Sequence, residues 1–205
     1  MSAEFWNDRF AHDTFVYGTA PNTFIAEATD AWLPPGCSVL DVGAGEGRNA
    51  VALARRGHAV TALDYSDEGL VKAETLAMRH GLTLDTIQAD VTTWTPERTW
   101  DALVCTFLHL PAPDRPRFYE TLQAALAPGG WLVAEWFRPE QITEGYDSGG
   151  PPDVTMMVTP QELRDAFDPA GLQVLRDATP TLDEGPHHQG PAATVQCVWH
   201  KPDAA

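Results

Sequence analysis

The stretch Val39–Asn49 reads VLDVGAGEGRN and is the most informative part of the chain. An apolar run leads into Gly43, Gly45 and Gly47, and a helix is expected to follow over residues 49–56. Glycines between a buried strand and a helix allow the backbone to approach a bound ligand closely. The stretch therefore predicts a strand, a ligand-binding loop and a helix of an α/β sheet.

Short apolar runs alternate with longer amphipathic runs along the rest of the chain, as in a parallel sheet with crossover helices. Strands are expected over residues 37–42, 58–63, 82–88, 102–107, 131–137, 172–178 and 193–200. Helices are expected over residues 2–10, 22–32, 49–56, 66–80, 117–126 and 160–167, with Asn22 and Ser66 as N-caps. The last two strands are expected to pair in antiparallel fashion at an edge of the sheet.

Length and composition fit one globular domain, residues 1–205. Hydrophobic residues make up 43% of the chain, which is too apolar for a disordered protein. The 13 Lys and Arg residues against 29 Asp and Glu residues give a net charge of −16, which would repel a phosphate backbone. We therefore expect no nucleic-acid partner.

The chain carries no stretch long and apolar enough to span a membrane, and residues 1–10 do not resemble a signal peptide. Cys37, Cys105 and Cys197 lie in apolar runs without a CxxC motif, and the adjacent His187 and His188 would point to opposite sides of an extended chain. We expect a cytoplasmic protein with buried free thiols, no metal site and no membrane partner.

Three carboxylates follow three successive strands: Asp41, Asp64 and Asp90. A dinucleotide fingerprint, GxGxxG, fails because Arg48 stands where its third glycine should be. A carboxylate at position 41 would repel a pyrophosphate but suits the ammonium and sulfonium groups of S-adenosylmethionine. Position 64 suits ribose hydroxyls, which both ligands share, and position 90 suits an adenine amino group. The charges favour S-adenosylmethionine over NAD.

The ordered motifs DVGAGEGRN, ALDYS, QADV and LAPGGWLV resemble those of the class I S-adenosylmethionine-dependent methyltransferases, over about residues 39–133. The resemblance implies a Rossmann-like three-layer α/β/α sandwich with a seven-stranded, mostly parallel sheet, one antiparallel strand and strand order 3-2-1-4-5-7-6. It implies S-adenosylmethionine as cofactor and S-adenosylhomocysteine as product. The expected cofactor-binding residues of this core are Asp41, Gly43, Ala44, Gly45, Gly47, Asn49, Asp64, Tyr65, Ser66, Asp90, Val91 and Thr106.

Three further segments, WNDRF, YGTAPN and DEGPHHQGPA, are similar to small bacterial methyltransferases of the tellurite-resistance and thiopurine-methyltransferase-like group. This similarity implies that residues 1–35 form a helical cap over the cofactor, with Trp6 and Tyr17 against it. An aromatic residue on an N-terminal helix equally suits the core. The family's EGxxHxG pattern coincides with His188.

Candidate catalytic residues are His109, which follows the fourth expected strand, and His188. Each has a plain alternative: His109 as a structural histidine, and His188 as a solvated loop residue. Residues 138–160 are expected to form a lid-like insertion whose Tyr146, Met156 and Met157 help to shape the acceptor pocket, although both methionines suit the core as well. Cations for an anionic acceptor would come from Arg48, Arg115 and Arg138.

The sequence predicts a monomeric or homodimeric methyltransferase acting on a small molecule, such as a thiol or a chalcogen oxyanion. Residues 106–109 (TFLH) lack the [ND]PP[YFW] motif of DNA amino-methylases, which agrees with the charge. One alternative is an S-adenosylmethionine-binding protein without turnover, and a weaker one is an NAD-dependent oxidoreductase. The acceptor atom cannot be read from a fold resemblance.

Overall fold

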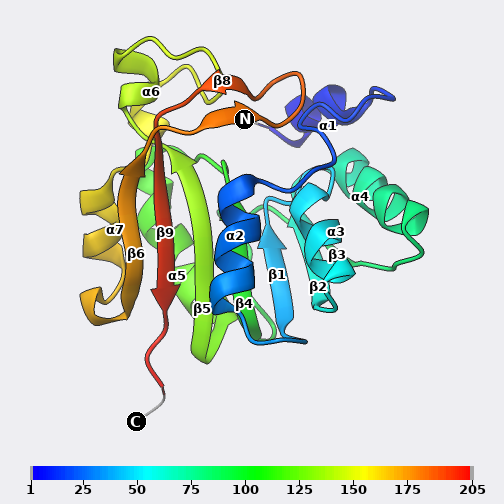
Figure 1. Ribbon diagram of the computed structural model, residues 1–205, viewed down its shortest axis with the longest axis horizontal. Coiled ribbons are helices and arrows are strands. Elements are labelled where there is room, and N and C mark those ends of the chain that lie inside the picture. The colour runs from blue at the N-terminus through cyan, green and yellow to red at the C-terminus, as the bar shows by residue number, and fades with distance from the viewer. Residues whose placement is uncertain (1, 204–205) are drawn as a thin grey trace.

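A seven-stranded sheet forms the middle layer of the computed structural model, which describes residues 2–203 (Figure 1). Its order is β3-β2-β1-β4-β5-β9-β6, and β9 runs antiparallel to both of its neighbours. The strands are β1 (Ser38–Val42), β2 (Ala59–Asp64), β3 (Asp85–Gln88), β4 (Trp100–Thr106), β5 (Leu126–Phe137), β6 (Leu172–Ala178) and β9 (Thr194–His200). The seventh expected strand is β9, so the expected fold class and strand order are confirmed. Of the expected domain, residues 1, 204 and 205 lie outside the described residues.

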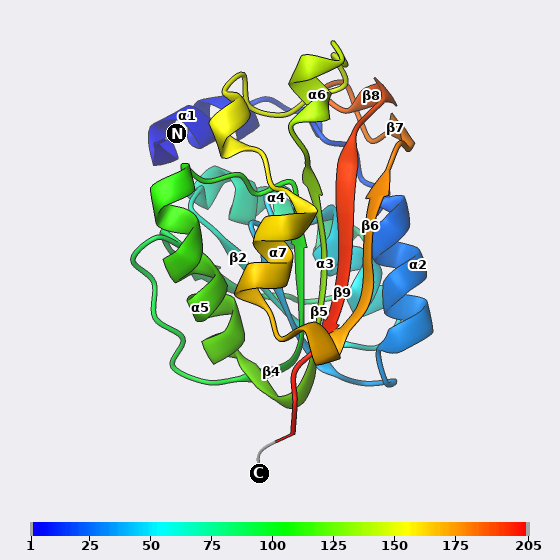
Figure 2. The same cartoon turned by 90° about the vertical axis from the view of Figure 1, so that its left-hand side faces the viewer.

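Helices cover both faces of the sheet (Figures 1 and 2). One face carries α2 (Thr23–Trp32), α3 (Arg48–Arg55) and α4 (Asp67–Arg79), and the other carries α5 (Arg115–Ala125) and α7 (Pro160–Ala166). Two short helices, α1 (Ala3–Phe10) and α6 (Glu140–Thr143), lie beyond the carboxyl ends of the parallel strands. Short 3-10 turns occupy Ala112–Asp114, Val154–Met156 and Pro169–Gly171. No helix within residues 2–203 is both long and apolar enough to cross a bilayer.

Two apolar layers sandwich the sheet, and β5 contributes to both because successive side chains of a strand point to opposite faces. Leu132, Ala134 and Trp136 pack in the layer under α5 and α7, whereas Val133 packs in the layer under α2 and α3. Glu135 shares the face of Val133 and is 1% exposed. A carboxylate in that position needs polar partners, and these partners belong to the site described below.

The last two expected strands form the antiparallel pair of β6 and β9, with β6 at the edge of the sheet. Residues 89–99 join β3 to β4 without a helix, and Trp94 packs there near Trp100, with ring centroids 6.2 Å apart. A small hairpin was not expected at all: β7 (Thr181–Asp183) pairs with β8 (Gln189–Pro191) over the carboxyl edge of the sheet. Strands of three residues are too short for an alternation pattern to reveal them.

The first 35 residues divide between two places. Helix α2 is part of the sandwich, because Phe24, Ile25 and Ala28 bury its apolar face in the layer shared with β1, β4 and β5. Helix α1 instead packs against α4 near the glycine loop. Of these first 35 residues, only those before α2 can therefore lie over the glycine loop.

Candidate functional site

The glycine loop between β1 and α3 is held against β2. The amides of Gly43 and Ala44 donate to the Leu63 carbonyl at 2.8 and 2.9 Å. Gly47 has φ +83°, and a Cβ there would lie 2.5 Å from the Cβ of Ala73 on α4. A side chain at position 47 is therefore excluded by both conformation and packing.

Two buried carboxylates flank this loop at the ends of β1 and β2. Asp41 is 1% exposed, and its Oδ2 has no hydrogen-bond partner within residues 2–203. Burial raises the pKa of Asp41 to about 7. Asp64 accepts hydrogen bonds from the amides of Gly45 at 2.7 Å and Ser66 at 2.8 Å. Burial also raises the pKa of Asp64, although these amides oppose the rise.

The other residues expected at this edge of the sheet differ in burial and in hydrogen bonding. Asp90 follows β3, and its Oδ1 accepts hydrogen bonds from the amide and hydroxyl of Thr92 at 2.9 and 2.7 Å. Val91 is buried in the core under α5, and Tyr65 is 37% exposed. Ser66 accepts from the Gly69 amide as the N-cap of α4. The structure thus brings the three acids to the ends of β1, β2 and β3, as the sequence predicted.

Ser66 also donates to Oδ1 of Asn7 on α1 at 2.5 Å, which gives a testable link between α4 and the N-terminal segment. We expect Ser66→Ala to lower the free energy of unfolding by about 1 kcal/mol, the usual value of an N-cap, and to speed amide exchange in α1. Thr159→Ala is the matched control, since Thr159 caps α7 and accepts only from Glu162. Chemical denaturation and hydrogen exchange measure both effects, and equal exchange of α1 in the two variants would contradict the link.

Aromatic residues of the N-terminal segment lie against the glycine loop. Phe10 is 3% exposed, and a Cβ at Gly45 would lie 3.4 Å from its ring. Trp6, one of the two expected aromatic residues, stacks on Phe10 with ring centroids 5.7 Å apart. The hydroxyl of Tyr17 accepts a hydrogen bond from Arg9 at 3.0 Å. Sequence reasoning missed Phe10, although it sits in the same amphipathic run as Trp6.

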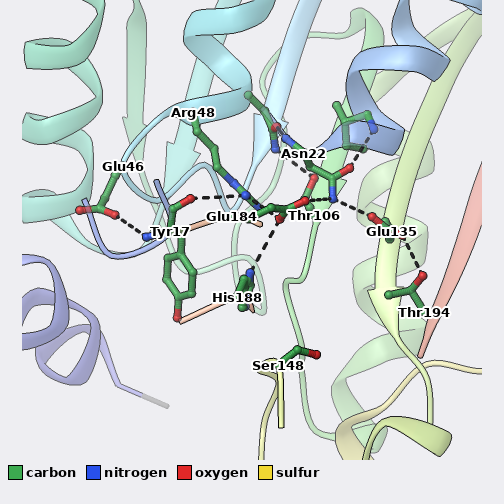
Figure 3. A network of polar contacts seen from close by, with 12 residues as sticks. Tyr17, Asn22, Glu46, Arg48, Thr106, Glu135, Ser148, Glu184, His188 and Thr194 are labelled. Atoms are coloured by element: carbon green, nitrogen blue, oxygen red, sulfur yellow. Dashed lines mark hydrogen bonds and ion pairs between the residues drawn. The ribbon is translucent and has the colours of Figure 1, made fainter. Parts of the chain in front are cut away.

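A buried polar network centred on Asn22 joins four separate elements (Figure 3). The Asn22 side chain donates to Glu135 on β5 at 2.7 Å and to Glu184 on the β7–β8 hairpin at 2.9 Å. Arg48, at the start of α3, forms an ion pair with Glu184 at 2.6 Å. The backbone amide of Asn22 donates to Asn49 at 2.9 Å. We call these residues the Asn22 network.

The two carboxylates of the Asn22 network have different partners. Glu135 accepts from Thr194 and Gln196, each at 2.8 Å, in addition to Asn22. Burial raises the pKa of Glu135, and these donors oppose the rise. Burial also acts to raise the pKa of Glu184, but the neighbouring His188 and Arg48 outweigh it and hold that pKa below its usual value. Glu184 therefore stays ionised.

His188 lies next to Glu184 among aromatic rings. Its Nδ1 is 3.9 Å from a Glu184 oxygen. Its ring lies 4.6 Å from that of Tyr17, 4.8 Å from that of Phe107 and 5.5 Å from that of Phe137. Burial lowers the pKa of His188, so the imidazole is neutral near pH 7 and has a nitrogen free to accept a proton. The alternative of a solvated loop residue is wrong, because the side chain is buried.

His109 has no such freedom. Its Nδ1 hydrogen-bonds the Met156 carbonyl at 3.1 Å, and its Nε2 accepts from the Phe137 amide at 3.2 Å. Burial lowers the pKa of His109 to about 4. With both nitrogens engaged, a neutral His109 joins the end of β4 to β5 and the segment before α7. This geometry does not support the expected catalytic role.

The segment 138–160 closes over the same region. Gln141 on α6 donates to Ser148 and to the Gly149 carbonyl, each at 3.0 Å, and accepts from the Ala193 amide. A Cβ at Gly149 would collide with the His188 ring. Met157 is buried against Phe137, and Met156 contributes its carbonyl to His109. The expected insertion thus packs directly on His188.

Sequence reasoning missed three members of the site. Asn22 was expected only as a helix cap, a role that it also fills through its bond from the Ile25 amide. Glu135 interrupts the apolar run WLVAEWF, and an acid in a buried strand is a signal that could have been noticed. Glu184 begins the same EGxxHxG pattern that contains His188, so the pattern itself was the available signal.

Comparison of the chain with known protein families gives a match that includes the glycine loop and the three acids at the strand ends. A family model described as a methyltransferase domain matches residues 39–130. Residues 39–130 of the chain therefore match the class I S-adenosylmethionine-dependent methyltransferase domain. The family and its cofactor, S-adenosylmethionine, are those expected from the sequence.

Curated relatives of this chain include methyltransferases named for small-molecule substrates or pathways. A ubiquinone biosynthesis O-methyltransferase of Methylobacterium nodulans is 31% identical over 153 residues, which cover 67% of this chain and 60% of that protein. A 2-heptyl-1-hydroxyquinolin-4(1H)-one methyltransferase of Mycobacteroides abscessus is 29% identical, covering 65% of this chain and 62% of that protein. Across the first eight relatives, the chain spans 38% to 66% of their length.

Solved structures share the fold. TehB from Haemophilus influenzae superposes with a TM-score of 0.73 at 19% identity, covering 96% of this chain and 67% of that one. A TehB-like methyltransferase from Corynebacterium glutamicum gives a TM-score of 0.57 at 21% identity, covering 97% of this chain and 95% of that one. At these identities, the likeness concerns the fold alone.

Proposed function

We propose that this methyltransferase transfers the methyl group of S-adenosylmethionine to a small-molecule acceptor at the carboxyl edge of its sheet. The observation that carries the proposal is the partnerless Oδ2 of buried Asp41 beside the glycine loop. A buried carboxylate without a partner is costly, and a cationic ligand would relieve that cost. S-adenosylmethionine supplies such a cation.

The other groups around the loop suit the rest of the cofactor. Each Asp64 oxygen accepts one backbone amide, and each carboxylate oxygen can accept a second donor, here a ribose hydroxyl. We assign Asp90 to the adenine, and Trp6 and Tyr17 to the cover over the cofactor, together with Phe10. The remaining proposed cofactor contacts are Gly43, Ala44, Gly45, Gly47, Asn49, Tyr65, Ser66, Val91 and Thr106.

The chemistry of transfer needs one proton acceptor at most. When bound, S-adenosylmethionine would supply an electrophilic methyl group, and the electron pair of the broken carbon–sulfur bond would stay with sulfur as the acceptor–carbon bond forms. A proton on the acceptor atom goes to Nε2 of His188, whose Nδ1 faces Glu184 at 3.9 Å. The Glu184 carboxylate then stabilises the imidazolium. The segment 138–160 acts as the lid that excludes water.

Calorimetric titration with S-adenosylmethionine, S-adenosylhomocysteine and NAD in parallel tests the cofactor. We expect both adenosyl ligands to bind and NAD to show no heat of binding. Acceptor-dependent formation of S-adenosylhomocysteine then distinguishes an enzyme from a protein that binds the cofactor without turnover. Binding of NAD alone would overturn the proposal.

We expect the affinity for S-adenosylmethionine to rise with pH because Asp41 must be ionised to bind a cation. With a pKa of about 7, the carboxyl is mostly neutral at pH 6, and the affinity should increase roughly eightfold by pH 7.5. The folded pKa lies above the ordinary value of 3.8, so the free protein should lose stability as pH rises from about 4 to about 7. Calorimetry at the two pH values measures the affinity, and Asp41→Asn should bind weakly at both. A wild-type affinity independent of pH would contradict this role of Asp41.

A further inference from the structure

The arginines that could receive an anionic acceptor are already neutralised. Arg48 forms an ion pair with Glu184 at 2.6 Å, Arg115 with Glu162 at 2.5 Å, and Arg138 with Glu140 at 2.6 Å. The same holds for Lys72, which pairs with Glu46. An oxyanion that binds one of these four cations would have to displace its carboxylate. Arg9, which donates to the Tyr17 hydroxyl at 3.0 Å, is the cation near the site that is not held in such a pair within residues 2–203.

Carboxylates, in contrast, are in excess around His188. The Asn22 network holds two of them, Glu135 and Glu184, with Arg48 as its one cation. Glu135 is 1% exposed, and its partners Asn22, Thr194 and Gln196 are all uncharged. Burial raises the pKa of Glu135, and its three donors oppose that rise. Glu184 is balanced by Arg48, so the network has no cation left over for an anionic acceptor.

The other neighbours of His188 are aromatic and carry no charge. Phe107 and Phe137 stack with ring centroids 4.3 Å apart and planes inclined by 14°. His188 meets both rings edge-on, at 84° and 81°. A desolvated anion beside Glu184 would be repelled by that carboxylate, and the two phenyl rings offer it no hydrogen-bond donor.

We propose that the acceptor reaches this site as a neutral molecule whose nucleophilic atom carries a proton, and not as an oxyanion. The shared chemistry is that of a thiol or a phenol: the proton passes to His188 Nε2 as the bond to the methyl carbon forms. This inference rests on the proposed function. Of the two acceptor classes that the sequence predicts, this inference keeps the thiol and excludes the chalcogen oxyanion.

A paired test uses benzyl mercaptan, which is neutral near pH 7, and selenite as the oxyanion. The full chain is first saturated with S-adenosylmethionine, and formation of S-adenosylhomocysteine is followed with each acceptor. We expect turnover with the thiol and a kcat/KM for selenite that is lower by about 100-fold or more, as for like charges brought together in an interface. Equal or faster turnover of selenite would overturn the inference and direct attention to Arg9, which contacts the Tyr17 hydroxyl.

A charge variant makes the test independent of the chosen thiol. Glu184→Gln leaves Arg48 without its carboxylate, so the complex of this variant with S-adenosylhomocysteine should gain selenite binding that the wild-type complex lacks. The matched control is Glu162→Gln, which releases Arg115 from its ion pair away from His188 and should gain none. Calorimetry measures selenite binding, and thermal melting establishes that each variant is folded.

Each combination of results decides the inference. Selenite binding to the wild type, no gain in Glu184→Gln, or an equal gain in Glu162→Gln overturns it. A gain confined to Glu184→Gln supports it, even if benzyl mercaptan proves too large to turn over. Failure of the proposed function is seen separately. A protein that does not bind the cofactor forms no complex with S-adenosylhomocysteine at the start, and a protein that binds the cofactor without turnover forms no S-adenosylhomocysteine with any acceptor.

Discussion

We expect His188→Gln to form product about 10² to 10⁴ times more slowly than the wild type, the usual contribution of a positioned general base. The reason is that His188 is neutral, has its Nδ1 3.9 Å from the Glu184 carboxylate, and lies against Tyr17. Glutamine keeps hydrogen-bonding capacity but cannot take up a proton. The measurement is single-turnover formation of S-adenosylhomocysteine, with the affinity for that product unchanged.

His187→Gln is the matched control, because His187 is the exposed neighbour of His188 on the same hairpin. It should retain wild-type turnover. The pH profile gives a second readout: burial lowers the pKa of His188 below its ordinary value of 6.5, so the wild-type rate should fall only as the pH drops below that range. A wild-type rate in His188→Gln would exclude His188 as the base. The same dependence of the rate on pH in the variant and in the wild type would also exclude it.

The sheet could be predicted because its signals are local. Each parallel strand is a short apolar run, and the glycine loop directly follows the first of them. Asp41 and Asp64 end adjacent strands, β1 and β2, and parallel strands carry their carboxyl ends to one edge. Neighbours in sequence thus determine the glycine loop and the acids beside it.

The Asn22 network could not be predicted because its contacts join distant parts of the chain. Asn22 meets Glu135 113 positions later and Glu184 162 positions later. No periodicity links these residues, and each has a plain local explanation as a cap, a strand residue or a loop acid. Only the folded chain shows that one amide bridges two buried carboxylates.

His109 and His188 illustrate the same limit. In the sequence, both are histidines beside apolar or glycine-rich segments, and both were candidates for catalysis. The structure separates them by their neighbours. Met156 and Phe137 occupy both nitrogens of His109, whereas within residues 2–203 no hydrogen bond engages Nε2 of His188 and its Nδ1 lies 3.9 Å from a Glu184 oxygen. Residue type suggests a role, but long-range packing decides whether a nitrogen remains free.

The proposed cofactor side and the proposed acceptor side of the site contact each other directly. The His187 amide donates to the Val16 carbonyl at 3.3 Å, and a Cβ at Gly18 would lie 3.2 Å from the Gly185 nitrogen. The N-terminal segment and the β7–β8 hairpin therefore pack backbone to backbone. A change that loosens one of them should disturb the other, which is why cofactor affinity is the essential control for every acceptor-site variant.

We expect Asp64→Asn to weaken the affinity for S-adenosylmethionine by about 10-fold to 150-fold. Charge-assisted hydrogen bonds are worth about 1.5 to 3 kcal/mol each, and tenfold in affinity corresponds to about 1.4 kcal/mol. Asparagine also puts an amide donor where Asp64 accepts from Gly45 at 2.7 Å or from Ser66 at 2.8 Å. The substitution therefore disturbs the glycine loop as well as the proposed ribose contact.

The control for Asp64→Asn is Asp67→Asn, the same chemical change three positions later on the exposed first turn of α4. Asp67 favours the helix dipole, so its loss should cost about 0.3 to 1 kcal/mol of stability and leave the affinity unchanged. Calorimetric titration of both variants separates the two effects. Because the Gly45 amide is held by Asp64, a folded Asp64→Asn protein that still binds S-adenosylmethionine as tightly as the wild type would show that neither the carboxylate nor the loop geometry it fixes holds the cofactor.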